Sequence, residues 1–240
     1  MKVCADANTQ MNVANANAMN FLIINPIVSA KLVKSGEKLL LLWLYIDNMY
    51  TSNKKIILGS ASPRRKELLA GLGVDFEVDT KNNFEEIYSP DTPQEQIPHA
   101  LSEGKSYGFH RALKNDEILI TSDTLVLCDG HVMGKPHDRE EAYRMLRLLS
   151  GREHKVITGV TVRDSEKTLT SSDTAIVHFK ELTDNEIYHY IDTFKPFDKA
   201  GAYGIQEWIG YIGIDRIEGS YFTIMGFPVH LVYRMLQKFL

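Results

Sequence analysis

Cysteine is scarce in this sequence of 240 residues, which contains only two, Cys4 and Cys128. Two cysteines provide neither a framework of several disulfides nor the four ligands of a structural zinc site. We therefore expect a reduced, cytoplasmic protein.

An excess of basic charge is also missing. The 27 Lys and Arg residues are outnumbered by 31 Asp and Glu residues, which gives a formal net charge of −4. No overall positive field is available to attract DNA or RNA, so we expect no nucleic-acid partner. Any anionic ligand has to be held by a local group of cations. The chain is long enough to bury a sizeable core, in one domain with two lobes.

Long apolar segments are absent as well. The apolar run at residues 38–46, KLLLLWLYI, is far too short to cross a bilayer, and we expect no membrane partner. It belongs to residues 1–48, which are rich in Asn, Ala and Met and differ from the rest. We interpret these as an N-terminal extension of doubtful order, with Met49 as the natural start and 49–240 as the folded domain. A secretory signal is the alternative, which a long polar leader before the basic residues disfavours.

The remaining sequence alternates between strand and helix patterns. Apolar runs bounded by turn signals predict strands at 54–58, 74–80, 117–130, 154–164 and 168–182. Helical periodicity and capping residues predict helices at 63–73, 94–114, 138–151, from Thr183, and from about Pro228 to the end. We expect the strand at 117–130 to be interrupted at TSDT. Strands interspersed with helices indicate an α/β fold with a mixed sheet.

The stretch GSASPRR, residues 59–65, predicts a phosphate site. It leads from a strand into a helix, whose first turn offers free N–H groups and partial positive charge. Ser60 adds a hydroxyl, while Arg64 and Arg65 add planar guanidinium groups suited to phosphate. Cations at this end of a helix oppose its dipole, so an anion is needed to explain them. The alternative is that both arginines are solvated; the stretch matches neither a Walker loop nor a dinucleotide fingerprint.

A carboxylate, Asp123, interrupts the apolar pattern of ITSDTLV and is followed by Thr124. A carboxylate among apolar strand residues is unfavourable unless it is paired, hydrogen-bonded or bound to a metal. We consider it a metal ligand or general base, and backbone hydrogen bonding as the alternative. Glu85 and Glu86 lie in a polar loop that would reach the same sheet end. With phosphates they would complete a Mg²⁺ site.

Three lysines on turns and helix faces, Lys105, Lys135 and Lys199, would help to neutralise a triphosphate. Asp198 lies next to Lys199 and would orient it. Gln206 carries both a donor and an acceptor and is suited to the edge of a base. Each of these residues alone is more often simply solvated.

These motifs together resemble those of the Maf nucleotide pyrophosphatases. The matching segments, which extend from about Lys54 to the C-terminus, are GSASPRRKELL, SDTLV, GKP, LSGREHKVITGV and DKAGAYGIQ. The resemblance implies hydrolysis of a nucleoside triphosphate between the α and β phosphates, with Mg²⁺ or Mn²⁺. It also implies a two-lobed α/β fold of the Maf and inosine-triphosphatase type, in which helices flank an elongated mixed sheet. The active cleft lies between the lobes, and members often form homodimers.

The resemblance also implies roles for individual residues. Asp123 matches the proton acceptor and, with Glu86, would hold the metal. Substrate choice would depend on Arg64, Thr124 and Gln206. The remaining matched positions would bind phosphate: Ser60, Arg65, Lys105, Lys135 and Lys199.

The SPRR and DKAGAYGIQ forms resemble those of the dTTP/UTP pyrophosphatase branch. This resemblance agrees with the chemistry of Arg64 and Gln206, which can hydrogen-bond a thymine or uracil edge. In the 7-methyl-GTP branch the residue matching Arg64 is typically Trp, which stacks on a cationic base. Two positions depart from the family pattern. Glu207 stands where many members have Gly, and Gly104 weakens a predicted helix by about 1 kcal/mol relative to Ala.

Two other functions remain open. One is a pyrophosphatase for 7-methyl-GTP or other modified nucleotides. The other is a nucleotide-binding regulator of septum formation or cell division that does not depend on hydrolysis.

Overall fold

The computed structural model describes residues 54–240; the extension predicted for residues 1–48 lies outside them. In the described part, seven strands form one sheet in the order β2-β1-β3-β5-β6-β7, with β4 paired to β3. The strands are β1 (Lys55–Leu58), β2 (Phe76–Val78), β3 (Glu117–Cys128), β4 (His131–Met133), β5 (Glu153–Arg163), β6 (Thr168–Phe179) and β7 (Ile214–Glu218). Strand β1 is parallel to β2 and β3, and the other pairs are antiparallel. The predicted α/β fold with a mixed sheet is confirmed.

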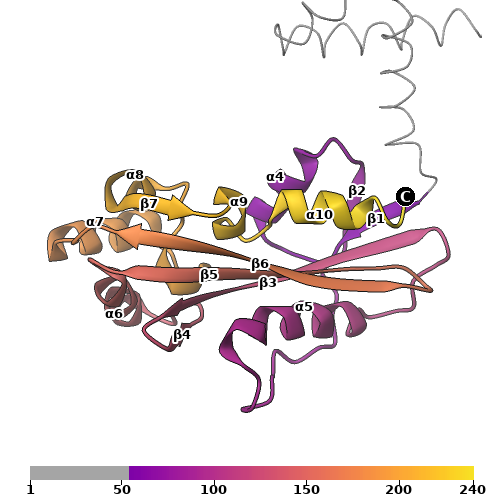
Figure 1. Ribbon diagram of the computed structural model, residues 1–240, viewed down its shortest axis with the longest axis horizontal. Helices are drawn as coiled ribbons and strands as arrows, with labels where there is room; N and C mark the ends of the chain where they lie inside the picture. Colours follow the sequence, from indigo (N-terminus) through magenta and orange to yellow (C-terminus); the bar gives the residue numbers. More distant parts are fainter. Residues whose placement is uncertain (1–53) are drawn as a thin grey trace, which may run out of the picture. The chain divides into compact units, whose positions relative to one another are not determined.

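Helices cover both faces of this sheet (Figure 1). They are α4 (Pro63–Ala70), α5 (Ile97–Tyr107), α6 (Arg139–Leu149), α7 (Asp184–Phe194), α8 (Trp208–Gly213), α9 (Tyr221–Ile224) and α10 (Val229–Leu236), with short 3₁₀ turns η1 (Gln94–Gln96) and η2 (Ala200–Ala202). Neighbouring residues of a strand point to opposite faces. Thr158 of β5 bonds to α9, whereas a side chain at Gly159 would meet α5, so these two helices lie on opposite faces.

Several predicted boundaries were wrong. Strand β3 continues through TSDT without a break, because Ser122, Asp123 and Thr124 all pair with β5. The helix predicted to run to residue 114 ends at Tyr107, since Gly108 closes it against the segment around Phe84. The first helix ends at Ala70 rather than near Gly73. Helix α8 was not predicted, since two glycines weaken its helical pattern.

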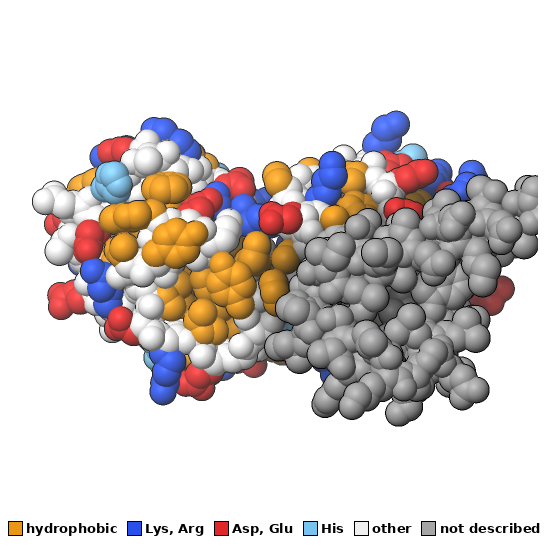
Figure 2. Space-filling view, turned by 90° about the horizontal axis from the view of Figure 1, so that it is seen from above, with side chains coloured by type: hydrophobic (Ala, Val, Ile, Leu, Met, Phe, Trp, Pro, Cys, Tyr) orange, Lys and Arg blue, Asp and Glu red, His pale blue; other side chains and the backbone are white. Residues whose placement is uncertain are grey.

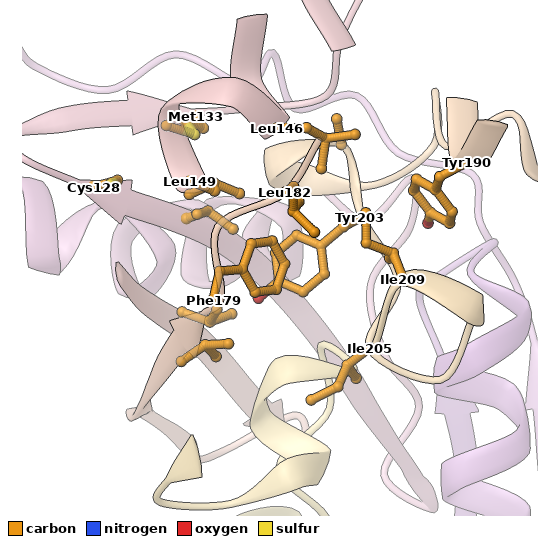
Figure 3. Packing of buried hydrophobic residues seen from close by; sticks show 14 of the residues in the cluster. Cys128, Met133, Leu146, Leu149, Phe179, Leu182, Tyr190, Tyr203, Ile205 and Ile209 are labelled. Carbon is orange, nitrogen blue, oxygen red and sulfur yellow. The ribbon is translucent and has the colours of Figure 1, made fainter. Parts of the chain in front are cut away.

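The two largest apolar clusters among residues 54–240 mark two lobes. The larger one packs α6, α7 and the turn around η2 against the ends of β3, β5 and β6; Tyr203, Phe179 and Leu182 lie at its centre (Figure 3). The second cluster packs α4 and α10 against β1 and the other half of β3 and β5, around Leu58 and Phe227. The long strands therefore connect both lobes, and residues in the middle of β3 lie at their junction.

The face that carries α8, β7 and α9 has a patch of hydrophobic side chains (Figure 2). Exposed aromatic residues of these elements are Tyr211, Tyr221 and Phe222. Patches of this kind often mark contacts with other proteins. The homodimer remains a prediction.

Candidate active site

A pocket of about 880 Å³ lies at the junction of the two lobes. The turn after β1, the middle of β3, the end of β4, the turn around η2 and the segment after α9 all line it. All ten residues to which the family resemblance gives a role are among the lining residues: Ser60, Arg64, Arg65, Glu86, Lys105, Asp123, Thr124, Lys135, Lys199 and Gln206. The fold therefore brings together residues that are up to 146 positions apart (206 − 60) in the sequence.

Lys105 joins the two carboxylates predicted to hold a metal. Its Nζ lies 2.5 Å from Asp123 Oδ1 and 2.8 Å from Glu86 Oε1. Partial burial raises the pKa of Glu86, but the hydrogen bond and charge of Lys105, with Lys135 and Arg65, outweigh it and lower the pKa below its usual value. Both carboxylates thus face one cation, and all three residues line the pocket.

The carboxylate pair fits a divalent metal of the Mg²⁺ type. Such an ion binds one or two carboxylates and takes its other ligands from substrate phosphates and water. Glu86 and Asp123 converge on one point, occupied here by the Lys105 ammonium. Among residues 54–240 no group of three or more His, Cys, Asp or Glu residues would hold a metal by itself. Two carboxylates leave the other coordination positions of such an ion to ligands from outside the chain.

Gly104 explains how Glu86 is placed. A Cβ at this position of α5 would lie 2.3 Å from the Phe84 ring, so the missing side chain makes room for Phe84 to pack on the helix. Phe84 precedes Glu86 by two residues and anchors the loop that delivers it to Lys105. The glycine that weakens the helix by propensity thus serves packing beside the pocket. Glu85 is exposed and does not line the pocket.

Arg65 is half-buried and holds the pocket walls together. Its guanidinium donates to the carbonyls of Ser122 at 2.7 Å and Gly226 at 2.9 Å, and to the hydroxyls of Thr124 at 3.1 Å and Ser60 at 3.3 Å. Burial lowers the pKa of Arg65, and the charge of Asp123 opposes this shift. With these donors engaged, Arg65 connects α4, β3 and the segment after α9.

Arg64, the neighbouring arginine, extends across the pocket. Its Nη1 lies 3.0 Å from Asp198 Oδ2, while Asp198 Oδ1 accepts a hydrogen bond of 2.7 Å from Lys199. Partial burial raises the pKa of Asp198, but the hydrogen bonds and charges of Lys199 and Arg64 lower it by more. The pKa of Asp198 therefore lies below its usual value. Asp198 therefore orients both a predicted phosphate ligand and a predicted specificity residue.

Gln206 has an unsatisfied acceptor. Its Oε1 is buried and makes no hydrogen bond within residues 54–240. A buried carbonyl oxygen without a donor is unfavourable, so a ligand donor in the pocket would stabilise it. The Thr124 hydroxyl, by contrast, is engaged by Arg65 and by the Thr158 hydroxyl at 3.0 Å.

The sequence analysis assigned no site role to four polar residues at or near the pocket: His154, Tyr190, Tyr203 and Glu207. His154 Nε2 lies 2.8 Å from the hydroxyl of Tyr203, which lines the pocket. For Glu207 the available signal was its departure from the glycine that many family members carry. For Tyr190 no signal was available, because its helix pattern is that of an ordinary core residue.

Comparisons with known proteins agree with the family resemblance of the motifs. Residues 55–239 match the family described as Maf-like protein. A dTTP/UTP pyrophosphatase of Porphyromonas gingivalis is 47% identical over 196 residues, covering 81% of this chain and 98% of the relative. A dTTP/UTP pyrophosphatase of Phocaeicola vulgatus is 50% identical over 184 residues, covering 77% and 95%. The solved Ham1 protein of Staphylococcus aureus covers 78% of this chain and 100% of its own at 13% identity, with a TM-score of only 0.44.

Proposed function

The chain belongs to the Maf-like protein family, as its motifs predicted, and on that premise we propose that it hydrolyses dTTP and UTP to the nucleoside monophosphate and pyrophosphate. The observation that carries this proposal is the convergence of Glu86, Lys105 and Asp123 in a pocket that also contains Arg64 and Gln206. Relatives named for this activity match at 47% and 50% identity over nearly their whole length.

Asp123 is the proposed general base. It lies in the middle of β3, where pairing with β5 fixes its backbone, and Lys105 fixes its carboxylate. Water opens the anhydride between the α and β phosphates, and Asp123 takes one proton from that water. A divalent metal held by Glu86 and Asp123 would polarise the phosphate oxygens.

The departing pyrophosphate carries the charge that develops in the reaction. Lys135 and Lys199 line the pocket, and Arg64 enters from the opposite wall. Fixed cations stabilise developing negative charge most when they are already in place. Ser60 lies two residues before Ser62, the N-cap of α4, and free backbone N–H groups in the first turn of this helix add donors.

Gln206 supports the choice of base. Thymine and uracil present an N3–H donor between two carbonyl oxygens, which an amide can match with its Oε1 acceptor and its Nε2 donor. In the same pose cytosine would set its unprotonated N3, an acceptor, against Oε1 and its 4-amino donor against Nε2. A site built around such a hydrogen bond rejects analogues that lack it.

The proposal is tested by pyrophosphate release from dTTP, UTP, CTP, GTP and 7-methyl-GTP in the presence of Mg²⁺. We expect release mainly from dTTP and UTP, and a loss of at least about 100-fold in Asp123→Asn. The matched control is Asp116→Asn, which changes a half-exposed carboxylate that pairs only loosely, at 3.9 Å, with Lys55. Full turnover by a folded Asp123→Asn variant would refute the role of Asp123.

The same panel separates the alternatives. Release from 7-methyl-GTP alone would keep the chemistry and overturn the base assignment. Tight nucleotide binding without pyrophosphate release would favour the division regulator. We also propose a cytoplasmic location; no helix in the described part of the chain is long and apolar enough to cross a membrane.

A further inference from the structure

Glu207, the residue after Gln206, makes contacts on both sides of its carboxylate. Its Oε1 lies 3.1 Å from Lys199 Nζ, and its Oε2 accepts a hydrogen bond from the Tyr190 hydroxyl. The side chain is only 20% exposed. The pairing of both oxygens offsets the free-energy cost of burying this charged carboxylate.

Lys199 depends on Glu207 for a permanent partner. The Lys199 side chain is 8% exposed, so its charge needs compensation inside the protein. Its other partner, Asp198, is 56% exposed and is shared with Arg64. Water or a bound anion will therefore replace Asp198 as a partner of Lys199 more readily than it replaces Glu207, which is less exposed. Glu207 therefore sets the position of the Lys199 ammonium.

Tyr190 connects the Glu207 carboxylate to the backbone by hydrogen bonds. Its ring is fully buried in the larger apolar cluster (Figure 3), and its hydroxyl accepts a 2.9 Å hydrogen bond from the Gly204 amide. Burial, with the Glu207 carboxylate, raises the pKa of Tyr190, so the hydroxyl stays protonated and donates to Glu207. Gly204 has no room for a side chain, because a Cβ there would lie 2.9 Å from Glu207 Cδ and 3.1 Å from Gln206 Nε2. The turn that carries Gln206 is thus packed directly on Glu207.

We propose that Glu207 is a positioning residue that couples the phosphate side of the pocket to its base side. Through Lys199 it fixes a cation for the triphosphate, and through Tyr190 and Gly204 it fixes the turn that presents Gln206 to the base. This inference rests on the proposed hydrolysis of dTTP and UTP. It adds a role for a residue that touches neither the reacting atoms nor the substrate.

We call the contact of Glu207 with Lys199 the Lys199 arm, and its link through Tyr190 and Gly204 to the turn of Gln206 the Gln206 arm. Two measurements separate them. Inorganic triphosphate, which has no base, is used as a competitive inhibitor, and its inhibition constant reports the Lys199 arm. The ratio of kcat/KM for dTTP to that for dCTP reports the Gln206 arm. In Glu207→Gln the amide places a donor against Lys199 or Tyr190, so we expect both the inhibitor affinity and the base preference to fall about tenfold.

Tyr190→Phe removes only the hydroxyl. We expect it to reduce the base preference about fivefold while the inhibition constant of inorganic triphosphate stays within twofold. Glu207→Asp keeps the charge, and we expect its inhibition constant to stay within threefold of the unmodified protein. Glu166→Gln, on the exposed turn between β5 and β6, is the matched control for loss of a carboxylate.

The outcomes are distinguishable. If the unmodified protein does not hydrolyse dTTP or UTP, the proposed function fails. If it does and Glu207→Gln retains both affinity and preference, the coupling role of Glu207 is refuted. Equal loss of both quantities in Tyr190→Phe would also refute it, because a general structural defect would not separate the arms. Should Glu207→Gln not fold, Glu207→Asp and Tyr190→Phe still decide between these results.

Discussion

Arg64 and Asp198 form an ion pair across the pocket, with Arg64 Nη1 3.0 Å from Asp198 Oδ2. Arg64 belongs to α4, whereas Asp198 precedes η2 in the other lobe. The two side chains are 22% and 56% exposed. An ion pair in contact with water contributes about 0–1 kcal/mol to stability, so its main effect is on the position of the guanidinium.

Replacing Arg64 or Asp198 by Ala should therefore reduce activity more than stability. We expect each variant to keep its free energy of unfolding within about 1 kcal/mol of the unmodified protein. The kcat/KM for dTTP should fall at least about tenfold, since each substitution removes about 1.4 kcal/mol or more of transition-state stabilisation. Urea unfolding and steady-state kinetics check both values. Because the two residues act as a pair, the double variant should lose less than the product of the single losses; independent losses would contradict the pairing.

Glu86→Gln should raise the requirement for divalent metal. The ionised Glu86 carboxylate is held ready by Lys105, which helps to lower its pKa, and an amide binds Mg²⁺ more weakly than a carboxylate. We expect the Mg²⁺ concentration for half-maximal activity to rise about tenfold, and a chelator to abolish activity in both proteins. Titration of activity with Mg²⁺ measures this. Glu85→Gln is the adjacent control, since Glu85 is exposed and lies outside the pocket lining; an equal effect there would refute the assignment.

Most of the sheet was predictable because strands such as β5 and β6 carry long β-branched runs between clear turn signals. Asp138 and Thr183 likewise marked the starts of α6 and α7 correctly, and both side chains accept the expected backbone hydrogen bonds. Ser62 is the N-cap residue of α4, yet its side chain makes no capping bond. Local patterns therefore located the elements better than their ends.

The sequence predicted which residues form the site better than it predicted the contacts between them. The motifs identified Arg65 as a phosphate ligand, whereas its donors engage Ser122 and Gly226, which are 57 and 161 positions away. Such pairings depend on how β3 and the segment after α9 pack, and no local pattern encodes them. The phosphate-binding role of Arg65 stays a prediction.

Gly159→Ala should destabilise the fold near the site. A Cβ at this position of β5 would lie 2.2 Å from the backbone oxygen of Pro98, so α5 would have to move away from the sheet. Overpacking of this kind costs about 1–3 kcal/mol, and we expect a loss in or above that range. Because α5 carries Lys105, activity should fall as well. Gly213→Ala is the control: its new Cβ would meet only flexible side-chain atoms, at 3.2 Å and 3.6 Å, and stability should change by less than about 1 kcal/mol.

His154 should make stability depend on pH. It is 2% exposed beside Phe179 and Tyr203, and burial, with a smaller contribution from the charge of His178, lowers its pKa from 6.5 to about 3. The unfolded chain therefore binds a proton below pH 6.5 that the folded protein does not bind until about pH 3. Between these values the free energy of unfolding rises with pH by up to about 1.4 kcal/mol per unit from this group alone.

His154→Gln should flatten that dependence. The amide can still bond the Tyr203 hydroxyl but does not titrate, so the slope between about pH 5 and 6.5 should decrease, whatever the absolute stability of the variant. This range lies above the ordinary pKa values of carboxyl groups, which limits their contribution. Urea unfolding at several pH values measures the slope. His131→Gln removes an exposed histidine and should leave the slope unchanged. If His154→Gln keeps the slope of the unmodified protein, His154 must be protonated in the folded state, and its bond to Tyr203 would then be that of a cation.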